Sequence, residues 1–441
     1  MKEFLKQHVV RLLWAETRLV LKKYHPTVIA VTGSVGKTST KDAIVHVLSA
    51  GMPEGYVRGN KKSFNSEIGI PLTVLGLPNA WSNPISWLWN LLRGLCLALL
   101  PCAYPRVLIL EVGADHPGDI EKAALAIRPD IAVVTRLPDT PVHVENFADP
   151  EAVRREKAFL VEYMQPNGVF VGNADDPHVT ALRTKTTARF LSYGFDESAV
   201  IRATYPEIWY EEIDGVKTPK GMSFRIDKDG GSFPVRLRGV LGTQSIYAAL
   251  AALVVGTVRD VNLVDMTAAL GELETPRGRM RLLEGNNGTT LVDDSYNSSP
   301  VAAHAALAAL KEVEGKGRKI AILGDMLELG EWSDKEHRAV GRAAGGFLDI
   351  LVTVGKRAWG IVEGAKEAGM NSFHIVSFNS SEEAGGWLSQ HMQKGDVILA
   401  KGSQGSGANK IRIERAVKIL MAHPEDAEKV LVRQEPEWQE K

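Results

Sequence analysis

Cysteine is almost missing from this chain of 441 residues, which contains only Cys96 and Cys102. Two thiols in one apolar stretch exclude a disulfide framework and any cysteine-rich zinc site. Sparse cysteine suits a reducing compartment, so we expect a cytoplasmic protein. The first 26 residues keep charges throughout and have no small-residue cleavage site, which makes them a poor signal peptide.

An excess of positive or negative charge is lacking as well. Lysine and arginine number 52 against 53 aspartates and glutamates, which gives a formal net charge of -1. This balance provides no general attraction to a polyanion and no nucleic-acid motif is present, so we expect no nucleic-acid partner. The 44% of apolar and 24% of charged residues are typical of a soluble globular enzyme, and the length allows two or three domains.

Long apolar runs are scarce too. The most apolar stretch, Ile85–Leu100, has 16 residues and includes Asn90 and Arg93, so it is too short and too polar to predict a membrane-spanning helix. It lies in an apolar insertion at 78–105. This helix either packs on the protein body or at a dimer interface, or it lies on a membrane surface through 81–104, which would make the protein peripheral at the inner membrane surface. The basic residues that would assist membrane contact are Lys2, Lys6, Arg11, Arg18, Lys22 and Lys23.

One motif is present in full: TVIAVTGSVGKTSTKDAIVHVL has the pattern of a buried strand, a glycine loop and a helix. Gly33 and Gly36 allow backbone N–H groups to wrap a phosphate, and a helix beginning near Lys37 presents its positive end to the same anion. Lys37 would neutralise the β- and γ-phosphates of a nucleotide, and the Thr38 hydroxyl would ligate Mg²⁺. Because Val31 replaces the first glycine of the common spacing, the loop has the shorter T-G-x-x-G-K-T form. The predicted nucleotide contacts are Gly33, Ser34, Gly36, Lys37, Thr38 and Ser39.

Three further polar residues are candidates for a metal site beside this loop. Glu111 is the only acid that emerges from the aliphatic part of RVLILEVGADHPGDI, and ligands of open parallel sheets gather at the carboxyl ends of the strands. His143 follows the next candidate strand, and Lys157 falls on a predicted helix among other charges. Each residue taken alone also has a competing interpretation. Glu111 could be a surface acid at a strand end, His143 a structural histidine and Lys157 a solvated surface lysine.

The chain as a whole alternates short β-branched runs with helical stretches, the pattern of a parallel sheet covered by helices. The candidate strands are Thr27–Val31, Val107–Leu110, Ile131–Thr135, Gly168–Val171, Thr289–Val292, Lys319–Leu323, Ile350–Val354, Phe373–Val376 and Val397–Ala400. We expect Ile201–Leu241 to be irregular or antiparallel. Pro276 and Gly278 punctuate a linker, so we place a boundary near Leu273. The predicted α/β fold has an N-terminal amphipathic helix at 1–26, a central P-loop ATPase domain with a mostly parallel sheet at 27–273, and a C-terminal Rossmann-like domain at 274–441.

A series of motifs runs in order from Val28 to about Ile413. They are TGSVGKTSTK, NSEIGIPLTVL, LEVGADHPGDI, NADDP, PRGRM, DDSYNSSP, LGDMLELG with a later EH, and GDVILAKGS. Together they resemble the Mur ligase family, and DDSYNSSP with LGDMLELG favours its branch that adds D-alanyl-D-alanine. The resemblance implies a nucleotide-binding central domain and a C-terminal Rossmann-like domain that closes over it.

The resemblance also implies roles for single residues of the metal site. Glu111 matches the family's ligand of the Mg²⁺ on the γ-phosphate, and His143 matches the ligand of a second Mg²⁺. Lys157 matches a lysine that is carbamylated in many members, where the new carboxylate helps to hold the metal. With Thr38 these residues form the expected metal site, and with Lys37 they form the expected catalytic set.

On the nucleotide side, Arg279 matches a linker arginine that reaches the phosphates. Asp294 matches an acid that bonds the ribose, and Asn297 lies close to the same site. The family usually has an adenine-reading asparagine in G-x-H-N, but LGTQSIYAAL places Gln244 and Ser245 there. A serine hydroxyl cannot reproduce the donor and acceptor of an amide, so Gln244 is the candidate for that contact.

The expected activity is ATP-dependent ligation, in which a peptide carboxylate attacks the γ-phosphate and an amine such as D-alanyl-D-alanine displaces phosphate from the acyl phosphate. Family members normally carry a UDP-sugar-binding domain ahead of the phosphate loop, whereas 26 residues precede Thr27 here, so we expect the substrate to be recognised differently. Two alternatives remain. One is a Mur-type ligase for a different, non-UDP or lipid-linked substrate, and the other is a catalytically silent Mur-like binding protein.

Overall fold

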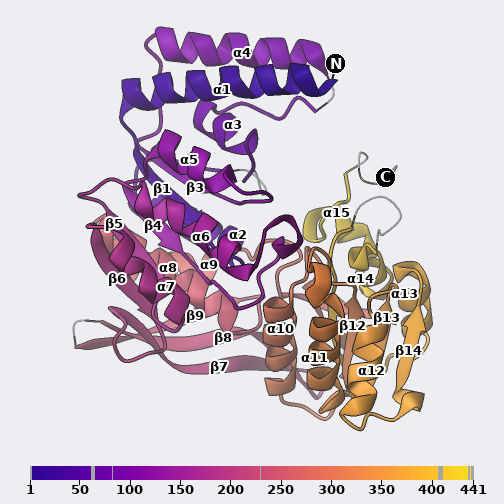
Figure 1. The fold of residues 1–441 in the computed structure, drawn as a ribbon. Helices are drawn as coiled ribbons and strands as arrows, with labels where there is room; N and C mark the ends of the chain where they lie inside the picture. The colour runs from indigo at the N-terminus through magenta and orange to yellow at the C-terminus, as the bar shows by residue number, and fades with distance from the viewer. Residues whose placement is uncertain are drawn as a thin grey trace.

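The computed structural model describes residues 2–60, 65–81, 83–228, 230–405, 411–435 and 438, with side chains from Lys6 onward. The side chain of Lys2, which we counted among the basic residues of the N-terminal helix, therefore lies outside the described residues. Two sheets, each covered by helices, make up the described chain, and the chain passes from the first to the second once (Figure 1). This arrangement confirms the predicted α/β class.

The first sheet is mostly parallel. Its strands are β1 (Thr27–Thr32), β2 (Val57–Gly59), β3 (Val107–Glu111), β4 (Ile131–Val134), β5 (Val169–Asn173), β6 (Arg189–Gly194), β7 (Ile201–Ile213), β8 (Val216–Lys228) and β9 (Gly231–Arg238). They lie in the order β2-β3-β1-β4-β5-β6-β7-β8-β9, parallel as far as β7 and antiparallel from β7 to β9. The antiparallel strands fall within the segment that we expected to be irregular or antiparallel.

Helices cover both faces of this sheet. They are α1 (Lys2–Tyr24), α2 (Lys37–Gly51), α3 (Gly69–Leu75), α4 (Pro84–Leu99), α5 (Asp119–Ile127), α6 (Pro150–Glu162), α7 (Pro177–Ala181), α8 (Thr243–Val258) and α9 (Leu263–Glu272). Ile29 and Val31 of β1 pack with α2 and α8 in one core, whereas Val28 and Ala30 pack with α1 and α5 in another. Because both faces are buried, the central strands are continuous apolar runs rather than alternating ones.

The second sheet has strands β10 (Arg281–Gly285), β11 (Thr289–Asp294), β12 (Lys319–Gly324), β13 (Ile350–Val354), β14 (Ile375–Phe378) and β15 (Val397–Lys401). Their order is β10-β11-β15-β12-β13-β14, and only the β10–β11 pairing within it is antiparallel. The helices around it are α10 (Pro300–Glu312), α11 (Ser333–Gly345), α12 (Trp359–Glu367), α13 (Ser381–Ser389), α14 (Ile413–Leu420) and α15 (Ala427–Val430). The chain changes sheets between β9 and β10, and we keep 27–273 and 274–441 as proposed domain limits.

One strand prediction was wrong at its start by more than one residue. The strand expected from Phe373 begins at Ile375, because Ser372–His374 form a short 3₁₀ turn. The Asn371 side chain accepts from the Phe373 amide and caps this turn, and Phe373 itself is 94% exposed. Strands β2, β6 and β10 were not predicted, because their short or polar sequences give little signal.

The apolar insertion forms α4, which lies along α1 at one end of the molecule (Figure 1). The helix packs on the body, and its apolar residues Trp87, Leu91, Leu97 and Ala98 are partly buried against the core. Its buried residues are Asn90 and Gly94, and the Asn90 amide donates to the Pro78 carbonyl over 2.8 Å. Among the described residues, no helix is both long and apolar enough to cross a membrane.

Candidate functional site

The glycine loop between β1 and α2 passes very close to the residues that follow β4. Gly33 has a φ of +138°, and a Cβ at this position would lie 2.1 Å from the Thr135 hydroxyl. Only glycine fits such an approach. Thr135 donates to the Val35 carbonyl over 2.6 Å, and the Ser34 amide donates to the Arg136 carbonyl over 2.8 Å. The end of β4 therefore holds the loop in place.

Helix α2 begins at Lys37, directly after Gly36, whose φ of +86° is again a conformation that favours glycine. The Lys37 ammonium donates to the Gly33 carbonyl over 2.8 Å. Burial lowers the pKa of Lys37, and the nearby Glu111 carboxylate opposes this shift. The Ser34 hydroxyl is buried without a hydrogen-bond partner within the described chain. The loop thus offers a cation and a spare hydroxyl to an anion.

Glu111 ends β3 and is almost fully buried beside the loop. One of its carboxylate oxygens accepts from the Thr38 hydroxyl over 2.9 Å, and the other accepts from the Asn65 amide over 3.0 Å. The Glu111 backbone amide donates to the Asn60 side chain over 2.9 Å. The structure therefore brings the predicted Thr38 and Glu111 together. It also adds Asn65, which our prediction missed although it opens the NSEIGIPLTVL motif.

His143 contacts Glu328, an acid in a loop of the second sheet. Its Nδ1 lies 2.7 Å from the Glu328 carboxylate, and its Nε2 lies 3.8 Å from the Asp115 carboxylate. The hydrogen bond from His143 lowers the pKa of Glu328. Both His143 and Glu328 have positive φ, +67° and +64°, which is uncommon for residues with a Cβ and typical of functional loops. The prediction included the LGDMLELG motif but gave no role to Glu328.

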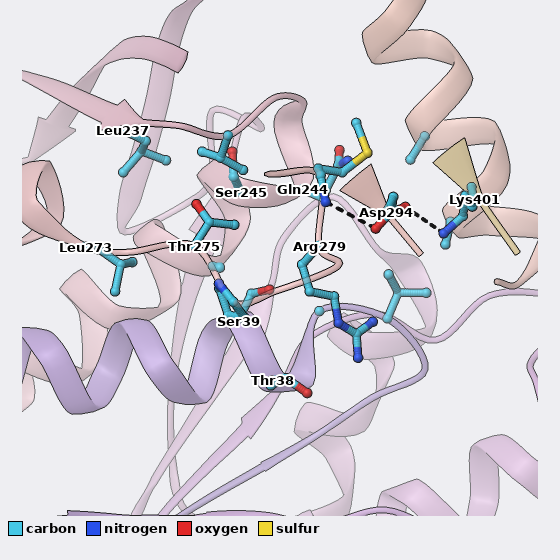
Figure 2. Close-up of a pocket in the computed structure, with 18 of the residues that line it drawn as sticks. Thr38, Ser39, Leu237, Gln244, Ser245, Leu273, Thr275, Arg279, Asp294 and Lys401 are labelled. Carbon is cyan, nitrogen blue, oxygen red and sulfur yellow. Dashed lines mark hydrogen bonds and ion pairs between the residues drawn. The ribbon is translucent and has the colours of Figure 1, made fainter. Parts of the chain in front are cut away.

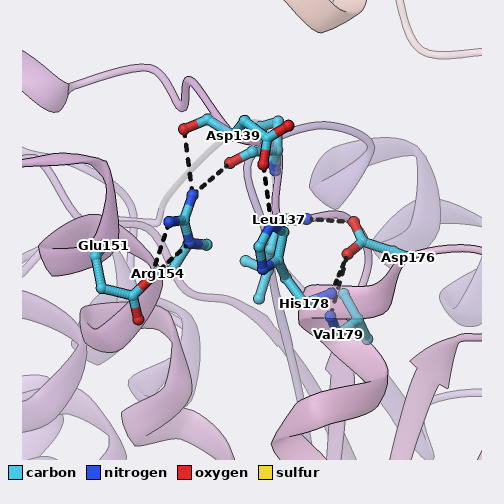
Figure 3. A network of polar contacts seen from close by, with 8 residues as sticks. Leu137, Asp139, Glu151, Arg154, Asp176, His178 and Val179 are labelled. Atoms are coloured by element: carbon cyan, nitrogen blue, oxygen red, sulfur yellow. Dashed lines mark hydrogen bonds and ion pairs between the residues drawn. The ribbon is translucent and has the colours of Figure 1, made fainter.

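The segment that leads from β4 toward His143 is fixed by a polar network (Figure 3). Asp176 of the NADDP motif accepts from the Leu137 amide over 2.8 Å and also caps α7. His178 Nε2 lies 3.0 Å from the Asp139 carboxylate. The Arg154 guanidinium donates to the Asp139 carbonyl over 3.2 Å. Helices α6 and α7 therefore hold this loop from both sides.

Lys157 on α6 is buried, with 2% of its surface exposed, so the interpretation as a solvated surface lysine was wrong. Burial lowers its pKa to about 7, and the positive charge of Lys37 acts in the same direction. The neighbouring Glu156 accepts from three backbone amides at the start of α5, over 2.7 to 3.2 Å. This cap anchors α6 beneath α5, which buries Lys157. At neutral pH a large share of the Lys157 amines is therefore uncharged.

A cavity lies where the phosphate loop, the start of α8 and the segment before β10 meet (Figure 2). Its wall is largely apolar and includes Leu237, Val240, Leu273 and Pro276. Ser39, Gln244 and Ser245 also line it. The Gln244 side-chain oxygen is buried and has no partner among the described residues, whereas the Ser245 hydroxyl donates to the Gly242 carbonyl over 2.7 Å. The amide of Gln244 is thus the group left available in this cavity.

Residues of the second sheet close the other side of the cavity (Figure 2). Asp294 ends β11, and its carboxylate accepts from the Lys401 ammonium over 2.6 Å and from the Met280 amide over 3.2 Å. Lys401 ends β15 and is 2% exposed. The Arg279 guanidinium lies over the Tyr296 ring, 4.1 Å from its centroid. Our prediction missed Lys401, whose motif GDVILAKGS gives no sign of its partner.

Asn297 lies in a neighbouring cavity rather than in that of Gln244. This second cavity is lined by Asn297, His143, Glu328, Arg357 and Ser403, together with nearby loop residues. The Asn297 side-chain oxygen accepts from the next backbone amide over 2.9 Å. Gly36, Thr38, Ser39, Gln244, Arg279 and Asp294 therefore line the first cavity, and His143 and Asn297 line the second. The other predicted site residues, Gly33, Ser34, Lys37, Glu111 and Lys157, line neither cavity.

Comparison with known proteins gives a consistent result. Residues 93–256 match the family described as Mur ligase middle domain, and residues 278–404 match the one described as Mur ligase, glutamate ligase domain. A UDP-N-acetylmuramoyl-tripeptide–D-alanyl-D-alanine ligase of Mycobacterium tuberculosis is 31% identical over 404 residues, 86% of this chain and 71% of that protein. Its Bacillus subtilis namesake is 27% identical and covers 92% and 78% of the two chains. The crystal structure of the MurF ligase of Thermotoga maritima in complex with ADP is 25% identical, covers 95% of this chain and 84% of that chain, and has a TM-score of 0.72.

Proposed function

This chain belongs to the Mur ligase family and is an ATP-dependent amide ligase, and from that premise we propose that it acts in peptidoglycan precursor synthesis. In this proposal it joins D-alanyl-D-alanine or a similar amine to a peptide carboxylate through an acyl phosphate. The observation that carries the proposal is the cavity at which the phosphate loop of the first sheet faces Arg279, Asp294 and Lys401. In this proposal the cavity would hold a nucleotide between the two halves of the molecule.

ATP fits the groups that this cavity offers. The amides of the loop, Ser34 and Lys37 would hold its phosphates, with Arg279 as a further cation. The unpartnered oxygen of Gln244 would accept from the adenine edge. Asp294 already accepts two hydrogen bonds, but a carboxylate has about four lone-pair sites and can accept a ribose hydroxyl as well.

Mg²⁺ fits the chemistry of the same site. Among the described residues no cluster of three or more His, Cys, Asp or Glu side chains could hold a metal alone, but Mg²⁺ is usually bound by one or two carboxylates together with substrate phosphates. The adjacent oxygens of Thr38 and Glu111 match that requirement. His143 uses Nδ1 for Glu328, as metal-bound histidines commonly do, which leaves Nε2 for a second ion. When bound, Mg²⁺ neutralises the charge on the transferring phosphate oxygens.

Lys157 completes this second site in the proposal. A buried amine with a pKa of about 7 can attack CO₂ in its neutral form, so that a new N–C bond forms and a proton is released. The product is a carbamate with two oxygens, a ligand that suits a hard cation. The positive charge of Lys37 nearby favours the anionic carbamate over the ammonium.

Each residue then has its own role in the proposed reaction. Lys37 and Arg279 stabilise the negative charge that spreads over the γ-phosphate as the peptide carboxylate attacks it. The amine approaches from the second cavity, and loss of phosphate leaves the amide. The contact between His143 and Glu328 joins the walls of that cavity and helps to keep water from the acyl phosphate.

Two narrower points belong to the proposal. The acceptor is either a UDP-linked or a lipid-linked peptide, and the chain makes peripheral contact with a membrane through 81–104. The intact set of Lys37, Thr38, Glu111 and His143 supports an active enzyme over a silent binding protein, because a scaffold has no physical need for it.

Phosphate release from ATP and Mg²⁺ tests the proposal. We expect release only when D-alanyl-D-alanine and a muramoyl-peptide acceptor, UDP-linked or lipid-linked, are both present. Lys37→Ala should abolish release, whereas Lys122→Ala, at an exposed position on α5, should leave it unchanged. ATP binding without release with either acceptor would contradict the proposed substrates, and no ATP binding would contradict the ligase.

A further inference from the structure

Helix α4 presents an apolar stripe to solvent. Its inner side carries the buried Asn90 and Gly94 together with apolar residues that are partly buried against the core, namely Trp87, Leu91, Leu97 and Ala98. The Asn83 side chain caps its start by accepting from two backbone amides. The exposed large apolar residues of the helix are Ile85, Leu88, Trp89, Leu92, Leu95 and Leu99. Successive members are one to four residues apart, so they form one continuous face. Their exposures run from 43% for Leu95 to 77% for Ile85, so the stripe is covered by nothing in the described chain.

Helix α1 extends this surface with two more leucines. A Cβ on Gly94 of α4 would lie 2.0 Å from the Glu16 carboxylate of α1, so Glu16 marks the side of α1 that touches α4. Leu12 and Leu19 lie four residues before and three residues after Glu16, which places them on the same side of the helix. Both leucines are about half exposed, at 51% and 50%. They therefore border α4.

Positive charge flanks the apolar surface. The segment from Leu77 to Arg106 contains no aspartate or glutamate. Arg11, Arg18 and Lys22 of α1 are exposed and share one face, because their spacings are seven and four residues. Arg93 of α4 is exposed as well.

The two helices are also fixed to each other, so the surface is presented as a unit. The Lys23 ammonium donates to the Leu97 carbonyl at the end of α4 over 3.1 Å. The Tyr24 hydroxyl donates to the same carbonyl over 3.2 Å. A preformed surface loses less conformational entropy on binding than a segment that must fold first.

We infer that the outer face of α4, with Leu12 and Leu19 of α1, docks on an anionic lipid surface. The helix lies in the plane of the interface, with its leucines and Trp89 among the acyl chains, and Arg11, Arg18, Lys22 and Arg93 meet the headgroups. A second copy of the chain fits less well, because face-to-face pairing would bring like charges together. In addition, the 16 residues of α4 provide about two heptads, whereas a coiled coil needs roughly three or four. The inference sharpens the membrane contact proposed above and does not depend on which bond the enzyme forms.

Flotation of the full chain with lipid vesicles tests the inference. We expect binding to vesicles that contain phosphatidylglycerol and weak binding to phosphatidylcholine alone. Leu88→Gln with Leu92→Gln should weaken binding about tenfold or more, since two buried side chains are lost. Replacement of Arg11, Arg18 and Lys22 by glutamine should weaken it about fivefold for each charge. The matched control is Leu125→Gln on α5, 52% exposed, which should bind like the original chain.

The two cysteines give an independent readout. Cys96 lies on the exposed side of α4 and Cys102 lies beyond the end of the helix. A polarity-sensitive fluorophore on Cys96, in a Cys102→Ser background, should shift to shorter wavelength with anionic vesicles and be quenched by brominated acyl chains. The same fluorophore on Cys102, with Cys96→Ser, should respond less.

Three outcomes would overturn the inference: no vesicle binding by a chain that still binds ATP, equal binding to neutral and anionic vesicles, or a dimer in solution that Leu88→Gln with Leu92→Gln dissociates. ATP-dependent ligation with soluble substrates should be the same in all these variants. Failure of the lipid inference and failure of the ligase proposal are therefore distinguishable.

Discussion

The Nδ1 atom of His143 lies 2.7 Å from the Glu328 carboxylate, and this contact joins a loop of the first sheet to a loop of the second. His143 follows β4 and Glu328 follows β12, so the contact spans two parts of the chain that are far apart in sequence. Both residues hold uncommon backbone conformations to make it. The contact therefore couples the proposed metal site to the relative position of the two sheets.

We predict that Glu328→Gln lowers kcat/KM about ten- to a hundredfold, the usual cost of removing the carboxylate that orients a metal-bound histidine. Glu331→Gln, an exposed glutamate three residues further along, should have no effect. Steady-state phosphate release checks both variants. Full activity of Glu328→Gln would show that the contact has no part in the reaction.

Lys157 should destabilise the folded protein at neutral pH and yet be required for ligation. Its folded pKa of about 7 lies below the ordinary value of 10.5, so its stabilising contribution is present only above pH 10.5 and is lost as the pH falls toward 7. Lys157→Met should therefore raise the melting temperature at neutral pH and abolish ligation. Lys185→Met, at an exposed position, should change neither. A lower melting temperature for Lys157→Met would contradict the predicted cost of burying this lysine at neutral pH.

Carbamylation of Lys157 predicts a dependence on CO₂. Activity should fall when bicarbonate and CO₂ are removed and should return when they are added back. Isotopically labelled bicarbonate should give a carbamate signal by NMR, and that signal should be missing in Lys157→Met. Activity that is independent of CO₂, with no such signal, would rule out the carbamate.

Gln244 should contribute to ATP affinity through its amide. We expect Gln244→Leu to raise the KM for ATP up to about tenfold, the value of one hydrogen bond, with less effect on GTP. Ser245→Ala should leave the KM unchanged, because that hydroxyl is already used by the Gly242 carbonyl. Steady-state phosphate release at varied ATP and GTP concentrations measures both variants, and an equal loss for the two nucleotides would contradict adenine recognition.

Breaking the buried pair of Asp294 and Lys401 should strongly destabilise the protein. Asp294→Asn leaves the Lys401 ammonium buried without its counter-charge, at a cost of about 3–5 kcal/mol in unfolding free energy. The double variant Asp294→Asn with Lys401→Met should recover much of the loss. Urea unfolding measures each variant, with Asp426→Asn of the exposed pair with Lys429 as a control that should not change. Equal stability of the single and double variants would show that the pair is not coupled.

Glu16 should make stability depend on pH. Burial raises its pKa from 4.5 to about 7, so its stabilising contribution is complete below pH 4.5 and is lost as the pH rises through 7. Glu16→Gln should remove this part of the pH dependence, and the exposed Glu54→Gln should retain it. Thermal unfolding between pH 4.5 and 8 gives the comparison. A parallel pH profile for Glu16→Gln would contradict the raised pKa.

Much of this account could be predicted from the sequence, because the phosphate loop and the strands around it are local features. Gly33 and Gly36 fix the loop through their own backbone conformations, and Glu111 follows from the rule that ligands gather at strand ends. Glu328 and Lys401 could not be given roles in this way. Their partners, His143 and Asp294, lie more than a hundred residues away. The packing of the two sheets brings His143 to Glu328, and the pairing of β11 with β15 inside the second sheet brings Asp294 to Lys401.

Burial was also hard to predict where a polar side chain faces inward. Lys157 stands among charged neighbours on α6, and its burial depends on Glu156 capping α5. In α4 apolar residues lie on both the inner and the outer side, so the pattern did not show which side would face the body. Tertiary contacts select the inner side, because Gly94 allows Glu16 of α1 to approach closely and Asn90 donates to a carbonyl.

The most direct test of the account follows one oxygen atom through the reaction. The acceptor carboxylate is labelled with heavy oxygen and ligated in the presence of ATP, Mg²⁺ and D-alanyl-D-alanine. If the carboxylate attacks the γ-phosphate, one labelled oxygen must appear in the released phosphate and one must remain in the new amide. Release of unlabelled phosphate would contradict an acyl phosphate, and with it the central claim that this chain is a Mur-type ligase in mechanism as well as in fold.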